Sequence, residues 1–321
     1  MAFKPPAMAP KGLWRRTPPA IFPPVLGLLG LGLAWRRGAG EFGLPQAIAD
    51  ALLGAVTLLF LFMALTYVVK FMRRPGVVAE DLKILPGRVG LAAGVLSLYL
   101  FAGVLTPYSA DQARPVLMLS LVLHLALVAL LLRQLVAGPP EQRHVTPVWH
   151  FSFAGFVVAA LVAQGLGLSG LTAALFWVSL PVAVLIWAAS ADQFRRERVP
   201  APLRPLLAIH LAPAALLGEV ALGQGMPGLA LGFGVVSAVL LAALGLAGRW
   251  LLRAGFSPLW GALTFPLAAT ASFWLSLGGG WRIPGGLVLV AATLIVIPIA
   301  IQVVKLWAKG QLAVKTNAAI A

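Results

Sequence analysis

The feature that most constrains this chain is a succession of ten long apolar segments, interrupted only where charges, prolines or glycines gather. Each segment holds about 17 to 27 residues, close to the roughly 20 that a helix needs to cross a bilayer. Across all 321 residues, 60% are hydrophobic and 10% are charged, and the mean hydropathy is +0.96. The segments are continuously apolar, whereas transmembrane strands alternate apolar and polar residues. The sequence therefore predicts an all-α polytopic membrane protein.

The ten predicted transmembrane helices have boundaries set by hydropathy. They are 20–36, 46–71, 88–106, 112–137, 149–166, 169–191, 205–223, 228–252, 257–277 and 284–307. The connections on one side are short and those on the other are longer and charged, which predicts five successive hairpins. We expect three regions: a basic, proline-rich cytoplasmic tail (1–19), the transmembrane domain (20–307) and a cytoplasmic C-terminal tail (308–321) that is frayed from Ala313 onward.

The distribution of charge predicts the orientation. Twenty Lys and Arg fall on the side of the termini and four on the other side, so the positive-inside rule places both termini in the cytoplasm. Five acidic residues lie on the side of the termini and four on the other side. The side of the termini therefore carries the whole net charge of +15, and the other side is neutral. This charge has two interpretations: insertion together with attraction to anionic lipid, or an inner mouth that concentrates anions. Neither implies a nucleic-acid partner.

The residues that carry most enzymatic chemistry are scarce. Cysteine is absent, and the four histidines have no metal-ligand spacing. No phosphate-binding loop or dinucleotide motif is present. Two carboxylates fall inside the predicted helices, Asp50 and Glu219. Each has a structural interpretation, as an acid near the outer interface, and a functional one, as a group that couples transport to an ion. We therefore expect no enzyme activity, no cofactor and no metal site.

Prolines interrupt several predicted helices, among them Pro23, Pro213 and Pro266. An interior proline lacks an amide donor and frees the carbonyl four residues earlier. Irregular backbone is tolerated at membrane depth only against protein or a water-filled cavity. Such helices are candidates to line a pathway, although even-numbered helices also contain prolines, at Pro181 and Pro298.

The ninth predicted helix is the most specific part of the sequence, with residues 257–268 reading SPLWGALTFPLA. It resembles the ninth helix of the tellurite-resistance/dicarboxylate transporter family, which includes the bacterial tellurite-resistance permease and the plant slow anion channel. Three further stretches agree in place and order: 22–27 with Trp35, 211–214, and 305–310. The resemblance covers about residues 17–312.

The resemblance implies five hairpins whose odd helices ring a pore, with even helices outside and three protomers side by side. Phe265 is then the gate. The other pore-lining or kinking candidates are Phe22, Pro23, Ser152, Phe153, Pro213, Thr264 and Pro266. Ser257 as a cap and Pro258 in the first turn predict a helix start that puts Phe265 about 12 Å along the helix, near mid-membrane.

Two departures from the family pattern stand out. The third helix lacks the proline expected of a lining helix, and the fifth is unusually aromatic, which predicts a narrowed conduit.

Three functional hypotheses follow. The first is a gated anion channel or facilitator that conducts small inorganic anions through each protomer of a homotrimer in the bacterial inner membrane. It fits a pore without fixed charge in its middle, where hydroxyls such as those of Ser152 and Thr264 bind weakly enough for flux. The second is a coupled transporter or exporter of dicarboxylate, sulfite or tellurite-type oxyanions. The third is a membrane interaction protein that does not conduct.

Overall fold

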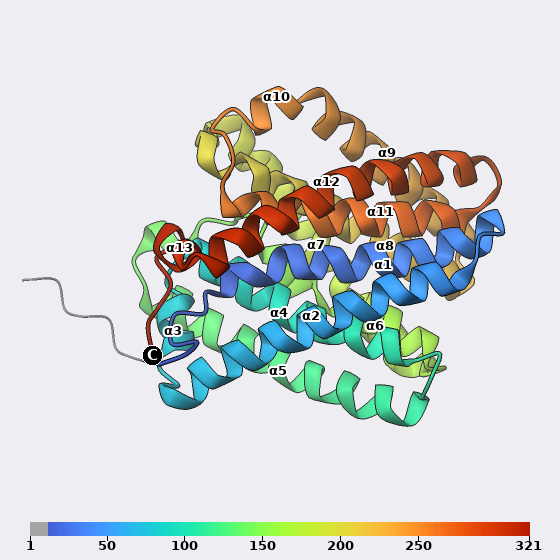
Figure 1. The fold of residues 1–321 in the computed structure, drawn as a ribbon. Helices are drawn as coiled ribbons and strands as arrows, with labels where there is room; N and C mark the ends of the chain where they lie inside the picture. The colour runs from blue at the N-terminus through green and yellow to red at the C-terminus, as the bar shows by residue number, and fades with distance from the viewer. Residues whose placement is uncertain (1–11) are drawn as a thin grey trace, which may run out of the picture.

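The structure is a computed structural model that describes residues 12–321, and every regular element in that range is a helix (Figure 1). Residues 1–11 of the expected N-terminal tail lie outside the described residues. The long α-helices are α1 (Phe22–Phe42), α2 (Gln46–Arg73), α4 (Leu85–Leu105), α5 (Ala110–Ala137), α7 (Ser169–Arg196), α9 (Pro227–Leu246) and α12 (Arg282–Ala308). The shorter ones are α3 (Val77–Asp81), α6 (Phe156–Gly165), α8 (Leu211–Gly223), α10 (Gly248–Leu251), α11 (Thr264–Leu277) and α13 (Gln311–Lys315).

Tighter or wider helical turns precede or connect several of these helices. Five are 3₁₀ segments and one, η3, is a π-helix. They are η1 (Pro19–Ile21), η2 (Pro140–Arg143), η3 (His150–Ala154), η4 (Ala201–His210), η5 (Pro258–Leu263) and η6 (Gly279–Trp281).

Within residues 12–321, eight helices are long and apolar enough to cross a membrane. They include 3₁₀ turns where these run directly into an α-helix, as in Pro19–Phe42 and Ala201–Gly223. The fifth predicted span corresponds to a shorter apolar helix, His150–Gly165, and the ninth to η5 followed by α11. The prediction of an all-helical membrane protein is confirmed, and the ten-helix arrangement stays a prediction.

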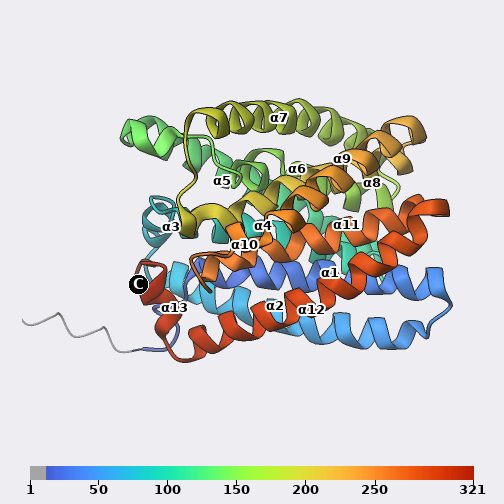
Figure 2. The ribbon, with the colours of Figure 1, turned by 90° about the horizontal axis from the view of Figure 1, so that it is seen from above.

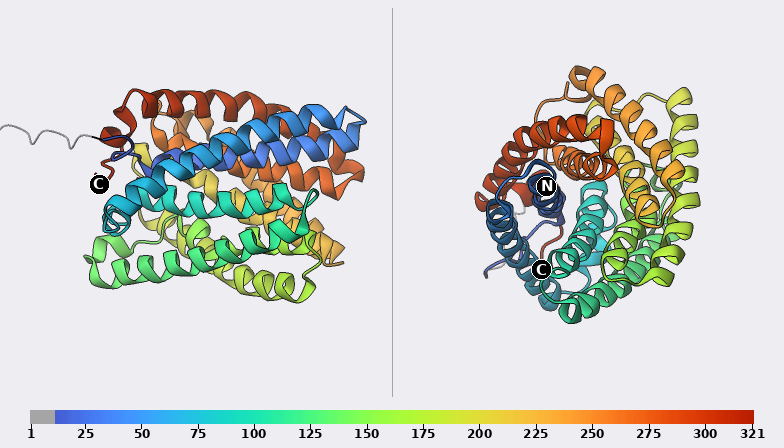
Figure 3. Two further views of the ribbon diagram at one scale, coloured as in Figure 1. Left: turned by 60° about the horizontal axis from the view of Figure 1, so that its bottom comes forward. Right: turned by 90° about the vertical axis from the view of Figure 1, so that its right-hand side faces the viewer.

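The helices separate into a buried and an exposed set. Between 67 and 78% of the apolar window is buried in the spans that contain α1, α4 and α8, against 22 to 33% in α2, α5, α7, α9 and the span of α12. Figure 2 shows α7 at one edge of the bundle and α2 and α12 at the opposite edge. The end-on view in Figure 3 shows the helices in two shells. Their apolar outer faces are those expected of lipid-facing helices.

Four of the buried elements change helix type partway along. A 3₁₀ segment runs into α1, α8 and α11, and the π-helix η3 leads into α6. A proline occupies the third residue of the α-helix in the first three cases: Pro24, Pro213 and Pro266. These prolines therefore lie in the first turn of an α-helix, directly after a 3₁₀ segment, and not in the interior of a regular α-helix, where we expected a kink.

Three local features differ from the predictions. The first helix continues through Arg36 and Arg37 to Phe42 and ends at Gly43 in the left-handed conformation, because a helix can extend beyond the apolar layer into water. Pro258 does begin a helix, but Ser257 makes no side-chain cap. Residues 313–321 are not frayed: α13 packs its Leu312 into the core, and the Ala321 amide donates to the Arg15 carbonyl.

One of the close approaches between buried helices joins α1 to α11. A Cβ on Gly27 would lie 2.1 Å from Thr264 Oγ1 and 2.2 Å from Thr264 Cβ, so only glycine fits there. The Thr264 hydroxyl lies 3.1 Å from the Pro23 carbonyl oxygen and 2.7 Å from that of Gly261. This contact sets the separation of the two helices at the level where both change to α-helical geometry.

We predict that Gly27→Ala lowers stability by about 1–3 kcal/mol, the usual cost of overpacking a well-packed core. The measurement is the melting temperature of the purified protein in detergent. Gly54→Ala is the matched control, since nothing lies within 4 Å of its added Cβ and alanine favours a helix. Equal melting temperatures for Gly27→Ala and the unsubstituted protein would show that this contact does not constrain the fold.

Candidate functional site

A cavity of about 580 Å³ lies between the buried helices at the end of the bundle opposite the termini. Its walls come from α1, α4, α6, α8 and α11, one from each odd-numbered predicted helix. On α11 the lining residues are Phe265, Ala269, Ser272 and Ser276, whose spacing of three to four residues marks one face of a helix. Five helices that are distant in sequence thus surround one space.

The mouth of the cavity holds its charged residues. Arg37 Nη2 lies 2.8 Å from Glu219 Oε1, and Arg36 Nε lies 2.8 Å from Asp50 Oδ1. Ser276 also bonds to Glu219, and Arg37 donates to Ser276. The Glu219 side chain is 6% exposed and that of Arg37 is 40% exposed, so the arginine is the partner that remains accessible. Asp50 and Glu219 are therefore each paired with an arginine, which agrees with the structural interpretation of these two acids.

Below its mouth the cavity has no charged lining residue. Gly30, Leu33, Leu100, Leu161 and Leu216 line this part. A path of this kind offers no fixed charge that would hold an ion tightly.

Phe265 is the lining residue of α11 farthest from the mouth, about 16 Å along the helix from Ser276. Its ring is 2% exposed, packs edge-on against Phe151 with centroids 6.2 Å apart, and lies 3.0 Å from the position of a Cβ on Gly30. The ring therefore forms the inner end of the cavity and is held between α1 and η3.

Of the eight site residues predicted from the sequence, Phe265 is the one that lines this cavity. Thr264 and Pro266 are its neighbours in the chain and are buried. Phe22 packs against the Tyr67 ring, with centroids 5.9 Å apart, and the Pro23 carbonyl accepts a hydrogen bond from the Thr264 hydroxyl. These residues lie around the inner end of the cavity without lining it.

The three remaining predicted residues, Ser152, Phe153 and Pro213, lie at the helix-type changes of η3 and α8. Ser152 is buried, and Phe153 packs on Trp149 with centroids 5.1 Å apart. The aromatic ring of η3 that meets Phe265 is Phe151. The sequence marks this segment as aromatic but does not single out Phe151, because the π-helix changes the rotation per residue.

Side chains of the outer helices donate hydrogen bonds to backbone carbonyls of the inner helices at the points where these helices are irregular. His124 of α5 lies 3.0 Å from the Ser152 carbonyl oxygen through Nε2 and 3.1 Å from the Tyr99 hydroxyl through Nδ1. Since a carbonyl only accepts, Nε2 carries the proton and Tyr99 donates to Nδ1. Trp187 of α7 donates to the His210 carbonyl at 3.1 Å. These contacts support the walls of the site.

The sequence did not predict a histidine pair between η3 and η4. His150 Nε2 lies 2.9 Å from His210 Nδ1, and His150 Nδ1 is buried without a partner in the part of the chain that the structure describes. The two residues are 60 positions apart, so no spacing within one helix indicates the pair.

A buried ion pair joins several segments at the opposite end of the bundle. Lys70 Nζ lies 2.9 Å from Asp81 Oδ2, with both side chains fully buried. Lys70 also donates to the Thr17 carbonyl, and the Ala319 amide donates to Asp81 Oδ1. The pair therefore connects α2 and α3 to the segments near both ends of the chain.

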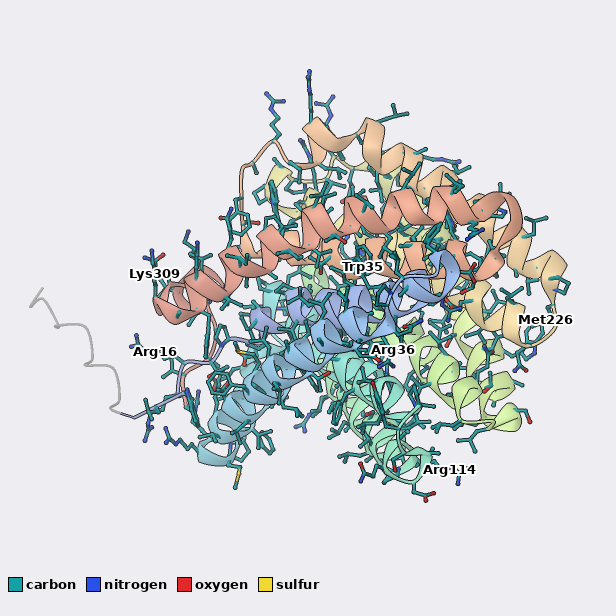
Figure 4. The ribbon with its side chains drawn as sticks, turned by 45° about the vertical axis from the view of Figure 1, so that its right-hand side comes forward. Arg16, Trp35, Arg36, Arg114, Met226 and Lys309 are labelled. Atoms are coloured by element: carbon teal, nitrogen blue, oxygen red, sulfur yellow. The ribbon has the colours of Figure 1, made fainter. Side chains whose placement is uncertain are left out.

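The two ends of the bundle differ in charge, as the sequence predicts. Figure 4 places Arg16 and Lys309 at one end and Arg114 and Met226 at the other. At the Arg114 end, Arg36, Arg37 and Arg282 each lie within ion-pair distance of an acid. At the Arg16 end basic residues are in large excess, and Arg74 donates to Glu80, which lowers the pKa of that carboxyl below its usual value.

We predict that a cysteine at Ser272 reacts with a water-soluble thiol reagent added on the Arg37 side, because Ser272 lines the cavity. A cysteine at the fully buried Thr264 should stay unmodified in the closed state. The chain has no cysteine of its own, so labelling can be followed by mass without background. Labelling at Thr264 with none at Ser272 would place the accessible path elsewhere.

Comparison with known proteins identifies one family. The family model described as voltage-dependent anion channel matches residues 16–308, which is most of the chain. No curated protein sequence matches significantly. The match confirms the resemblance found in the sequence and supports an anion channel or transporter function in a membrane.

Proposed function

The chain belongs to the voltage-dependent anion channel family, and on that premise we propose that it is a gated channel for small inorganic anions. The observation that carries the proposal is the cavity built from five buried helices, charged at its mouth, uncharged below and ended by Phe265. Anions that are held only by hydroxyls and backbone groups dissociate quickly enough for flux.

We propose that ten helices cross the membrane as five hairpins, with the odd ones around the conduit and the even ones outside. The fifth and ninth spans then include η3 and η5, whose irregular turns bring each to nearly the length of a bilayer crossing. The low burial of the even helices supports this arrangement. Three such protomers side by side form the proposed homotrimer, with one conduit in each.

The proposed orientation puts both termini in the cytoplasm of a bacterial cell, with the chain in the inner membrane. The basic end of the bundle then faces inward and raises the local concentration of anions at the inner mouth. Arg37 and Arg36 act similarly at the outer mouth, where their acidic partners leave little net charge. Anions thus meet a favourable potential mainly from the inside.

We propose Phe265 as the gate. An apolar ring at the narrow end of the cavity closes the path sterically and by excluding water, without a charged plug. Gly30 leaves room for the ring on one side and Phe151 supports it on the other. Rotation of the ring, or movement of α1 relative to α11, would open the path.

Phe265→Ala should raise anion conductance severalfold or more in planar-bilayer recordings, because it removes the ring that ends the cavity. Phe273→Ala is the matched control on the same helix: Phe273 is equally buried but packs against Gly218, where a Cβ would lie 2.2 Å from its ring. This control should lose stability, by about 3–5 kcal/mol, and gain no current. Destabilisation without added current in Phe265→Ala would assign Phe265 to packing alone.

Coupled transport is the second candidate, because Glu219 is a buried carboxylate beside the cavity. In a channel, Glu219 serves to orient Arg37 and no proton moves with the anion. We therefore expect the reversal potential to follow the anion gradient alone and to ignore an imposed pH gradient, both in the unsubstituted protein and in Glu219→Gln. A reversal potential that shifts with the pH gradient, and ceases to do so in Glu219→Gln, would favour a proton-coupled transporter.

A further inference from the structure

A second large cavity, of about 790 Å³, lies on the outside of the helical core near the basic end of the bundle. It is bounded by α7, η4, α9 and the 144–147 loop, and it shares no lining residue with the cavity that ends at Phe265. Val236 of α9 lines it and is 41% exposed, so the cavity is reached from the lipid-facing side. Its volume is within the range of pockets that take a small molecule.

The lining changes from charged to apolar along α7. Arg195 lies at the mouth and Trp187 lies at the depth of the cavity, about 12 Å farther along the helix. Leu206, Val236 and Leu240 provide the apolar walls between them. A ligand that fits this site is amphipathic, with its polar end at the membrane surface and its apolar end inside the bilayer.

The charges at the mouth favour an anion. Arg195 and Arg198 line it, and within residues 12–321 neither forms an ion pair, whereas the neighbouring Arg196 is held by Asp192 at 3.0 Å. Glu197 is the single acid of the lining, so cations are in excess. Guanidinium groups bind phosphate oxygens with two donors at once, and basic pockets between transmembrane helices on the cytoplasmic side are suited to anionic lipid headgroups.

A donor without a partner lies between the charged and apolar parts. Ser190 lines the cavity, and its hydroxyl is buried with no hydrogen-bond partner among residues 12–321. It lies about 7.5 Å deeper than Arg195 along α7, beneath the level of a phosphate that contacts the arginines. The ester carbonyls of a phospholipid lie at this depth, and rotation of the Ser190 side chain toward the cavity would let its hydroxyl donate a hydrogen bond to one of them. Leaving that hydroxyl unbonded costs free energy, which an ester oxygen would recover.

We propose that this cavity binds one anionic phospholipid per protomer, with its phosphate on Arg195 and Arg198, an ester carbonyl on Ser190 and one acyl chain reaching Trp187. The assignment rests on the proposed function in one respect, the placement of the basic end in the cytoplasmic leaflet. A bound acyl chain there contacts η4 next to His210 and so fills the space behind the irregular start of the seventh predicted helix.

The test is native mass spectrometry of the full chain in neutral detergent, titrated with phosphatidylglycerol or with phosphatidylcholine of the same acyl chains. We expect one phosphatidylglycerol to be retained per chain in preference to phosphatidylcholine. Replacing both arginines, Arg195→Gln with Arg198→Gln, should weaken that binding about thirtyfold, since each such cation contributes roughly a factor of five near an anionic headgroup. The control Arg249→Gln with Arg253→Gln removes the same charge from the same end outside the cavity and should change little.

A second pair of variants tests the acyl chain separately. Leu240→Trp fills the cavity without changing its charge and should also abolish retention, whereas Leu231→Trp, on an exposed part of the same helix α9, should not. Glycerol 1-phosphate, which has the phosphate but no chain, should bind far more weakly than phosphatidylglycerol. Equal binding of glycerol 1-phosphate, or an equal loss in the Arg249/Arg253 control, would overturn the lipid site in favour of a bare phosphate site or nonspecific charge attraction.

A change of oligomeric state in Leu240→Trp, with lipid retention intact, would also overturn the proposal by assigning this face to a second copy of the chain. The binding measurement needs no current, so a protein that fails to conduct anions leaves this test unaffected.

Discussion

Backbone groups inside a membrane must be satisfied by the protein itself, and this requirement governs the rest of the structure. The buried helices are irregular where a 3₁₀ or π segment meets an α-helix, and carbonyls there need donors from elsewhere. Thr264 of α11 donates towards the Pro23 carbonyl, and His124 of α5 donates to Ser152. The start of α1 and the segment η3 are therefore stabilised by side chains of other helices, which ties the folding of these buried elements to that of their neighbours.

The contacts between α1 and α11 also position Phe265 at the inner end of the cavity. Gly27 brings α1 against Thr264, and the next residue of α11, Phe265, lies against Gly30 one turn farther along α1. The position of the ring is thus set by the close approach of α1 and α11 at two glycines, together with the Phe151 ring on its other side. A gate built in this way responds to small relative movements of two helices, which accords with the proposed mechanism.

The charged residues are distributed unevenly between the two ends of the bundle. At the end of the bundle opposite the termini most basic residues are paired with acids, whereas basic residues are in large excess at the end that holds the termini. One pair at that end, Lys70 with Asp81, is removed from water and joins segments from both ends of the chain. Removing one partner of such a pair would leave an uncompensated buried charge, so the pair has a structural role. The exposed cations, by contrast, determine the electrostatic potential at that end of the bundle and at the proposed lipid site.

Hydropathy and charge alone predict the all-helical membrane class and the segregation of charge, because both follow from local composition and from the thickness of the bilayer. The sequence pattern around Phe265 was also sufficient to select that residue, through the resemblance of the ninth helix to a known family. Only the tertiary structure decided that Phe151 and not Phe153 meets this ring, that His150 pairs with His210, and that the prolines of α1, α8 and α11 lie in the first turn of their α-helices. These features depend on the rotational phase of irregular turns and on contacts between residues tens of positions apart, and neither quantity is encoded in the periodicity of one segment.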